Sequence, residues 1–279
     1  MIIDSHLHVW TQQTERYPWQ PIGDYIPENE ASVEQYIALM DREGVDRAVL
    51  VQPTPYGWDN SYLLDSAAAY PSRFRTVGLV DPLSEAGAER LEELVAKGMN
   101  GIRLNWHLQP VEVWEESPHH FRLWERAQQL DVPICLQMTL DYTRLVRRMA
   151  LNFSGVRIVI DHLAKPPKGC LPGDSAFQSF LKLSQYPNLY LKLSGMNYYA
   201  QESAPYQDTW PLLQAAKANF GSQRCMWGSD FPFVIEHWTY LDLLKTLKTR
   251  LGFSQVDLEW ILGKTARMLW WKEAEGGKK

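Results

Sequence analysis

The chain opens with MIIDSHLHVW, in which His6 and His8 stand one residue apart at the end of an apolar run. In a β-strand the side chains of residues i and i+2 point to the same side, so both imidazoles would face one metal ion or one substrate. The alternative interpretation is a pair of core histidines bonded to neighbouring backbone. Two histidines alone do not decide between these interpretations, so polar residues elsewhere in the chain become the evidence.

A third histidine, His162, ends another β-rich segment and stands next to Asp161. Adjacent residues of a strand point to opposite sides, so only one of these two side chains can face the interior. Val156, Ile158 and Ile160 have the spacing of interior positions, which would place His162 inside and Asp161 in the wall. We therefore predict a catalytic role for His162.

Asp230 ends the last β-rich segment, within WGSDFP, where Gly228 permits close packing. A carboxylate at this place can bind a metal ion or accept a proton from water, which makes Asp230 a candidate catalytic residue. The alternative is a buried helix N-cap. Three more polar residues end predicted strands and are candidates for substrate binding, namely Arg103, Asn105 and Gln137.

Lys165, within HLAKPPK, and Trp10, just beyond the first predicted strand, are further candidates for substrate contact. The flat face of a tryptophan can stack on a sugar-like ring. The alternatives are an exposed loop lysine and a tryptophan that packs between helices and strands.

These residues need a scaffold that brings distant segments together. Eight short β-rich segments alternate with segments of helical period along the chain. The β-rich segments cover 2–8, 47–53, 75–80, 101–105, 133–138, 156–162, 188–194 and 225–230, and four helical segments closed by glycine cover 31–44, 84–98, 141–155 and 209–221. This alternation predicts an α/β fold, a single-domain (β/α)8 (TIM) barrel. Such barrels build their sites at the carboxyl ends of the strands, so the candidate residues should converge there.

The chain shows no linker, repeat or low-complexity segment that would divide it. We predict that the barrel occupies residues 1–272 and that residues 273–279 form a flexible C-terminal tail.

The bulk composition argues against several partners. The formal net charge is −5 and no long run of Lys or Arg occurs, so we expect neither a nucleic-acid nor a membrane partner. The N-terminus lacks the features of a signal peptide. The three cysteines are far apart and odd in number, which favours a reducing cytoplasm. The oligomeric state stays open, a homo-oligomer included.

Four motifs in a fixed order resemble the amidohydrolase superfamily of barrel hydrolases. They are DSHLHVW at 4–10, GIRLN at 101–105, IDHLAKP at 160–166 and WGSDFP at 227–232. They are similar to the branch of predicted metal-dependent hydrolases that contains sugar-acid lactonases, of the fuconolactonase and rhamnonolactonase types, and 2-pyrone-4,6-dicarboxylate lactonase. The resemblance spans nearly the whole chain.

The resemblance implies a hydrolase that opens a small-molecule lactone, most typically an aldonic-acid lactone from sugar breakdown. It implies that Asp230 acts as the general base that activates water, while the histidines and Arg103 hold the substrate. Asn105, Gln137, Lys165 and Trp10 would complete the substrate contacts.

The sequence departs from the binuclear members of the superfamily. Such sites need a bridging Lys or Glu after a middle strand and two further histidines, whereas here Arg103 and Gln137 end the fourth and fifth predicted strands. One divalent ion such as Zn²⁺ could still bind to His6, His8 and Asp230, with His162 as a further candidate ligand. Because the resembled family contains a member that works without metal, the sequence leaves the metal requirement open.

Two other functions compete with lactone hydrolysis. One is a metal-dependent decarboxylase or amide hydrolase of the same superfamily, which also begins with H-x-H. The other is a barrel that only binds a ligand and keeps its histidines as polar fillers. The middle histidine pair expected of the metal decarboxylases is only half present here, which favours the lactonase.

Overall fold

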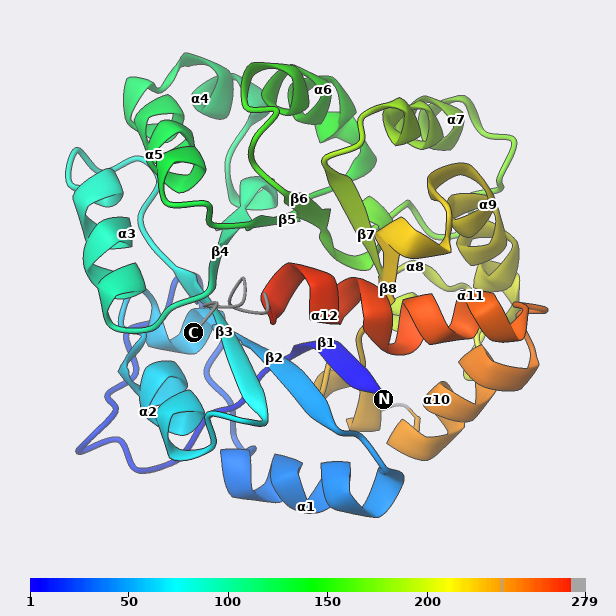
Figure 1. Cartoon of the computed structure of the whole chain (residues 1–279), viewed down its shortest axis with the longest axis horizontal. Helices are drawn as coiled ribbons and strands as arrows, with labels where there is room; N and C mark the ends of the chain where they lie inside the picture. The colour runs from blue at the N-terminus through cyan, green and yellow to red at the C-terminus, as the bar shows by residue number, and fades with distance from the viewer. Residues whose placement is uncertain (237, 272–279) are drawn as a thin grey trace, which may run out of the picture.

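The computed structural model describes residues 1–236 and 238–271 of the chain. Its eight parallel strands follow one another in chain order in a single sheet. They are β1 (Ile3–Leu7), β2 (Arg47–Val51), β3 (Phe74–Leu79), β4 (Gly101–Asn105), β5 (Ile134–Gln137), β6 (Ile158–Ile160), β7 (Leu189–Leu193) and β8 (Cys225–Trp227). A parallel bridge between Leu7 and Phe231 joins the segment after β8 to β1 and closes the sheet into a barrel (Figure 1). The predicted (β/α)8 barrel is confirmed, while the predicted tail, 273–279, lies outside the described residues.

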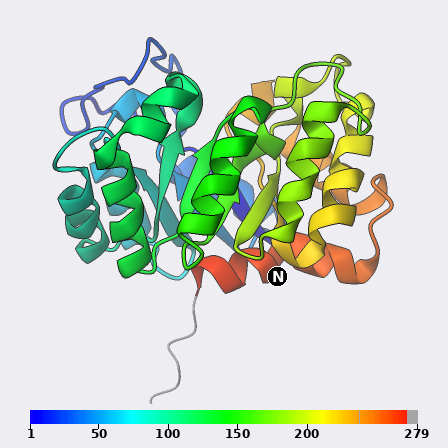
Figure 2. The same cartoon turned by 90° about the horizontal axis from the view of Figure 1, so that it is seen from above.

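Helices surround the barrel and connect its strands (Figure 2). They are α1 (Val33–Glu43), α2 (Ser61–Ala69), α3 (Gly87–Ala96), α4 (Val111–Glu116), α5 (Pro118–Gln129), α6 (Thr143–Asn152), α7 (Ser175–Leu181), α8 (Met196–Tyr199), α9 (Trp210–Phe220), α10 (Tyr240–Thr249), α11 (Gln255–Glu259) and α12 (Thr265–Trp270). The four segments predicted to be helical correspond to α1, α3, α6 and α9. In α1, Ser32 forms a capping box and Gly44 ends the helix with a φ of 69°. None of the described helices has the length and apolar character needed to cross a membrane.

Apolar side chains fill the interior of the barrel and form a cluster separate from the layer between strands and helices. This inner cluster consists of Ile3, Val49, Val51, Val77, Cys135, Val159 and Met226 from the strands and Ala266, Leu269, Trp270 and Trp271 from the end of the chain. α12 lies across the end of the barrel at which the strands begin (Figures 1 and 2). Gly101 leaves room for Trp270, since a Cβ there would lie 2.7 Å from its ring. Because this end is packed shut, a site has to open at the carboxyl ends of the strands.

β6 ends two residues earlier than predicted, and its side chains alternate in the opposite sense. Val159 belongs to the inner cluster, whereas Ile158 and Ile160 pack between strands and helices. The prediction that Ile158 and Ile160 face the interior is therefore wrong. Both sides of a strand in a parallel barrel are apolar, so hydrophobicity alone does not distinguish them. Asp161, predicted to support the wall, continues the inward alternation instead.

His162 reaches the interior by another route. After Asp161 the backbone is left-handed for four consecutive residues, from His162 to Lys165, with φ between 39° and 61°. Residues other than glycine rarely adopt this conformation, even singly. The turn brings His162 to the same side as Asp161, so both side chains face the interior and both are buried.

Candidate active site

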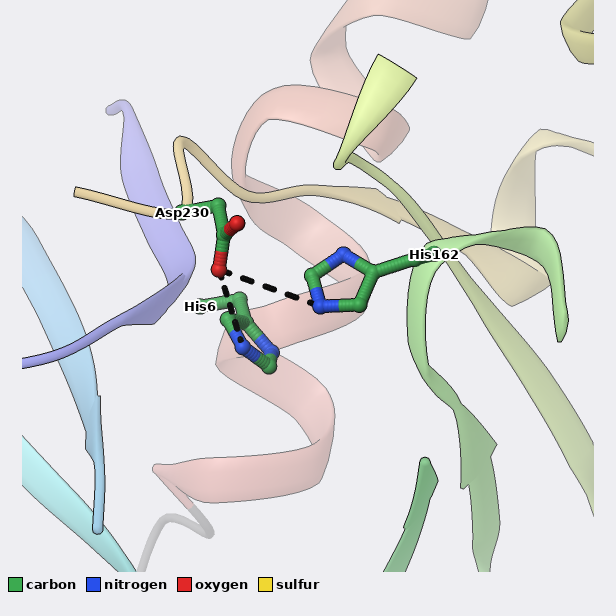
Figure 3. A group of neighbouring side chains, drawn as sticks. All are labelled: His6, His162 and Asp230. Atoms are coloured by element: carbon green, nitrogen blue, oxygen red, sulfur yellow. Dashed lines mark ion pairs between the residues drawn. The ribbon is translucent and has the colours of Figure 1, made fainter. Parts of the chain in front are cut away.

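Three histidines and one carboxylate meet at the carboxyl ends of the strands. Asp230 Oδ1 lies 3.5 Å from His6 Nε2, 3.5 Å from His8 Nε2 and 3.8 Å from His162 Nε2. Figure 3 shows the rings of His6 and His162 converging on this oxygen. All four side chains are buried. The structure thus brings together the four residues that the sequence predicted to be catalytic.

An irregularity in β1 directs its histidines inward. Ile3 belongs to the inner cluster and His6 also faces the interior, although the two residues are three positions apart. A regular strand would place these two side chains on opposite sides. The register between β1 and β2 shifts between Asp4 and Leu7, which accommodates the change.

Asp4 ties this part of β1 to the segment that carries Asp230. Its Oδ1 accepts hydrogen bonds from the backbone N–H groups of His6 (3.1 Å) and Ser229 (2.9 Å). Its Oδ2 accepts from the hydroxyls of Tyr36 (2.8 Å) and Tyr240 (2.9 Å). The two backbone bonds join β1 to the segment after β8 across the barrel's closing seam, from which His6, His8 and Asp230 project, while Tyr36 of α1 and Tyr240 of α10 hold the carboxylate in place.

Two glycines leave the space that the histidines need. A Cβ at Gly228 would lie 2.6 Å from the Cβ of His6, and one at Gly195 would lie 2.5 Å from Nδ1 of His162. Gly195 also has a φ of 64°, which glycine adopts without strain. The predicted close packing at Gly228 is therefore present.

Asp230 is held by both its backbone and its side chain. Its backbone N–H donates to the carbonyl of His6 (2.8 Å), and its Oδ2 accepts a hydrogen bond from the hydroxyl of Tyr198 (2.5 Å). Burial alone would raise the pKa of this carboxyl, but the adjacent His162 and His8 and the Tyr198 hydrogen bond hold the pKa below its usual value. Asp230 is therefore a carboxylate at neutral pH.

The histidines differ in how their Nδ1 atoms are bound. His8 Nδ1 lies 2.8 Å from the carbonyl oxygen of Val51, which can only accept, so Nδ1 carries a hydrogen. His162 Nδ1 lies 2.9 Å from the hydroxyl of Ser194. Burial holds the pKa of His162 well below its usual value.

A buried ion cluster, made of Asp161, Arg103 and Lys192, adjoins His6. Arg103 Nε lies 3.0 Å from Asp161 Oδ2, and Lys192 Nζ lies 3.0 Å from Asp161 Oδ1. His6 Nδ1 is 3.4 Å from the same Oδ1. Burial would raise the pKa of Asp161, but Lys192, His6 and Arg103 together hold it well below its usual value. One carboxylate thus balances two buried cations.

A cavity of about 290 Å³ opens onto Asp230. Its polar lining includes His8, Arg103, His107, Gln137, His162 and Tyr198, and its aromatic lining includes Tyr25 and Phe233. This volume is at the small end of ligand sites and suits a compact ring. Of the residues predicted to bind substrate, Arg103 and Gln137 line the cavity.

The other predicted substrate contacts lie around this cavity. Asn105 is buried at the end of β4, two residues after Arg103. Lys165 Nζ lies 4.1 Å from the centre of the Tyr198 ring. Trp10 is buried behind the wall, where its ring packs on Phe233 and Tyr25 and its indole N–H donates to the backbone. The structure thus places Trp10 as a support of the aromatic wall.

A family model described as Amidohydrolase matches residues 3–271, nearly the whole chain. The chain belongs to the amidohydrolase family. The family resemblance drawn from the four sequence motifs is confirmed.

Relatives of this amidohydrolase cover most of its length. The 4-sulfomuconolactone hydrolase of Hydrogenophaga intermedia is 28% identical over 86% of this chain and 76% of its own. The L-fucono-1,5-lactonase of Burkholderia ambifaria is 28% identical over 82% of this chain and 80% of its own. A solved structure from Pseudomonas putida, described as a candidate 2-pyrone-4,6-dicarboxylic acid hydrolase, is 28% identical with a TM-score of 0.84 and covers 98% of each chain.

The donor atoms of this amidohydrolase fit a divalent ion. His6 Nε2 and Asp230 Oδ1 are buried without a hydrogen-bond partner among residues 1–236 and 238–271. One donor atom from each of His6, His162 and Asp230 lies within 4.8 Å of the others. Imidazole and carboxylate groups are ligands that Zn²⁺ prefers. The sequence predicted His6, His8 and Asp230 as ligands with His162 as a further candidate, and the structure groups His6, His162 and Asp230.

Sequence analysis of this amidohydrolase missed Lys192 and Tyr198. A signal for Lys192 existed, because Leu189, Leu191 and Leu193 occupy the outer apolar layer and leave the alternate side chain of β7 to point into the barrel. A charge inside a barrel needs a partner, which Asp161 provides. Tyr198 follows β7 in a segment whose conformation no local pattern predicts.

Proposed function

We propose that this protein hydrolyses a lactone, and that the lactone is that of a sugar acid. The observation that carries the proposal is the ionised Asp230, whose unpartnered Oδ1 lies among three imidazoles at a small cavity. Two relatives are named as a 4-sulfomuconolactone hydrolase and an L-fucono-1,5-lactonase, and these names support a cyclic ester as the substrate. Gln137 and His107 offer hydrogen bonds to hydroxyl groups, and Tyr25 and Phe233 offer apolar faces to a sugar ring.

In the proposed mechanism Asp230 acts as the general base. Its Oδ1 takes a proton from a water molecule, whose oxygen attacks the carbonyl carbon of the lactone. The bond between this carbon and the ring oxygen then breaks, and the proton passes from Asp230 to the released alkoxide, which yields a hydroxy acid. Arg103 lines the cavity while its Nε is held by Asp161, so its terminal nitrogens can bind the carbonyl oxygen and then the new carboxylate.

A divalent ion, when bound, would supply Lewis acidity at the carbonyl and a more acidic water. His6, His162 and Asp230 are the residues that would hold it, with His8 as the fourth candidate ligand. The residues themselves still orient the substrate and accept the proton.

The proposal is tested by assaying purified protein against galactono-, fucono-, rhamnono- and xylonolactone and 2-pyrone-4,6-dicarboxylate, with acid release followed by a pH indicator. Each assay is run before and after chelation, with the metal content measured. Rapid hydrolysis of a sugar-acid lactone supports the proposal. Activity only toward the pyrone dicarboxylate would contradict the sugar-acid assignment. Turnover of an amide or an aromatic carboxylate with no lactone hydrolysed would overturn the lactonase in favour of the amide hydrolase or decarboxylase.

Replacing Tyr198 by phenylalanine should change the acid limb of the pH–rate profile. The pKa of Asp230 is held below its usual value partly by the Tyr198 hydroxyl, so rates in the wild-type protein should fall only at pH values below the usual range of an aspartate. Loss of a hydrogen bond to a charged group should move this limb upward by about one to two pH units. The profile of kcat/KM in short incubations measures the shift, and an unmoved limb would show that Asp230 is not the group that titrates.

The fall of kcat/KM at high pH, the basic limb of the pH–rate profile, should depend on Lys165. Burial and the charge of Arg103 lower the pKa of Lys165 to about 8, so this side chain is cationic below that pH and neutral above it. If the cation helps to bind the lactone or its developing carboxylate, kcat/KM should fall above pH 8 in the wild-type protein. The Lys165→Met variant should lack this fall and lose about tenfold in kcat/KM at pH 7. A basic limb that persists in the variant would assign it to another group.

A further inference from the structure

A fully buried histidine, His120 of α5, is surrounded by three tryptophans. Its Nε2 accepts the indole N–H of Trp106 (3.2 Å) and that of Trp124 (2.9 Å), and its Nδ1 lies 2.9 Å from the carbonyl oxygen of Trp114. An indole nitrogen can only donate and a carbonyl oxygen can only accept. His120 Nδ1 therefore carries the hydrogen and Nε2 carries none, so the ring is neutral. Burial lowers the pKa of His120 to about 4, which agrees with this assignment.

Three hydrogen bonds close into a cycle, which we call the His120 cycle. Trp106 donates to His120, His120 donates to the carbonyl of Trp114, and the indole N–H of Trp114 donates to the carbonyl of Trp106 at 2.9 Å. Trp124, one turn along α5, adds the second donor to His120. Because these side chains are buried, removal of the imidazole would leave two indole N–H groups without an acceptor.

The His120 cycle holds the connection between β4 and α5, residues 106–117. This connection consists of a turn of three residues, Trp106–Leu108, and of α4, which has six residues. Elements this short are not stable in water by themselves and depend on tertiary contacts. Their contacts include the His120 cycle and Tyr142, whose hydroxyl donates to the carbonyl of Gln109 (2.5 Å) and whose ring packs on Trp106.

The same connection supplies part of the wall of the substrate cavity. His107 and Leu108 directly follow Trp106, and both line the cavity. His107 Nδ1 lies 3.2 Å from the carbonyl oxygen of Gln137, the last residue of β5. A shift of Trp106 would move both side chains relative to Asp230, so the His120 cycle determines where this part of the wall lies.

We propose that His120 is a positioning residue, which holds the connection 106–117 in the shape that places His107 and Leu108 at the substrate cavity. His120 acts through Trp106 and Trp114 and determines how well the cavity binds its substrate. The statement about substrate affinity rests on the proposed lactonase function, whereas the statement about the connection does not. The experiments below separate the two.

The first test observes the His120 ring in the wild-type protein. In full-length protein labelled with ¹⁵N-histidine, long-range ¹H–¹⁵N spectra identify the protonated nitrogen of each ring, and the His120 signals are assigned by their loss in His120→Gln. We expect a neutral His120 ring at pH 7 with its hydrogen on Nδ1. Hydrogen on Nε2, or a charged ring at this pH, would overturn the inference.

The second test measures amide hydrogen exchange across residues 106–117, without any substrate. In His120→Phe two buried indole N–H groups lose their acceptor, so exchange in this connection should become about tenfold faster or more. Phe153→Leu is the matched control, because it removes apolar contacts with Trp124 but no hydrogen bond of the His120 cycle. Its exchange rates in 106–117 should stay within about threefold of wild type. Equal rates in the two variants, or an unchanged rate in His120→Phe, would contradict the proposal.

A milder variant keeps this test decisive if His120→Phe does not fold. Trp114→Phe keeps an aromatic ring but removes the indole hydrogen bonds to the carbonyls of Trp106 and Gln109. Exchange in 106–117 should become faster than in Phe153→Leu, while the amides of β4 stay protected. Exchange as slow as in the wild-type protein would contradict the proposal.

The third test measures steady-state kinetics on a lactone that the wild-type protein hydrolyses. His120→Phe should raise KM by about tenfold and leave kcat within about threefold, because a displaced wall weakens binding of substrate and transition state alike. Phe153→Leu should change neither constant by more than about threefold. Faster exchange in His120→Phe with an unchanged KM would overturn the positioning role. If no lactone is hydrolysed, the proposed function fails, and the exchange rates still decide whether His120 holds the connection.

Discussion

Replacing Asp230 by asparagine is expected to lower kcat by about 10²- to 10⁴-fold, the usual contribution of a general base. The asparagine keeps the shape of the side chain and can still accept the hydrogen bond from Tyr198, but it cannot take a proton from water. KM should change much less than kcat, because the cavity is preserved. Steady-state kinetics on the preferred lactone, at neutral pH, measure both constants.

A matched control for this variant is Asp41→Asn, which removes a carboxylate paired with Arg73 on the outside of the barrel. Its kcat should remain within about twofold of wild type, since surface substitutions rarely act at a distance. If Asp230→Asn retained more than about a tenth of the wild-type kcat, a general-base role for this residue would be ruled out.

Replacing Asp161 by asparagine should be the most destabilising conservative change in the site. It leaves the buried cations of Arg103 and Lys192 without their shared anion. Removing one partner of a buried ion pair typically costs about 3–5 kcal/mol in the free energy of unfolding. The midpoint and slope of urea denaturation measure the loss.

The control is Glu93→Gln, which breaks an exposed ion pair with Arg90 and should cost less than about 1 kcal/mol. Adding Lys192→Met to Asp161→Asn removes one of the two uncompensated cations, so the double variant should recover part of the lost stability. A double variant less stable than the sum of the single losses would show that the cluster does not act through charge balance.

The parts of this structure that could be predicted from sequence depend on local patterns. The alternation of β-rich and helical segments, together with the glycines that close four of the helical segments, predicted the barrel and several helices, and Gly44 does end α1. The i, i+2 spacing of His6 and His8 placed both at the site, although a register shift in β1 contributes to their direction.

The predictions of side-chain direction were wrong where that direction depends on contacts between distant strands. Asp161 was assigned to the wall because Ile158 and Ile160 were as apolar as the inward Val159. His162 was placed correctly inside the barrel but for the wrong reason, since its direction comes from a left-handed turn with no signature in its residue types. Lys192 and Tyr198 become recognisable only once Asp161 and Asp230 are known to lie opposite them.

The closing of the barrel by α12 also sets an order of events during synthesis. All eight strands leave the ribosome before residues 266–271, yet these residues supply Ala266, Leu269, Trp270 and Trp271 to the inner cluster. Until they emerge, one end of the apolar interior remains open to water. The chain therefore completes its interior only once α12 has been made. A variant that lacks residues 266–271 would expose the same interior that a nascent chain exposes, so we expect the loss of α12 to be poorly tolerated.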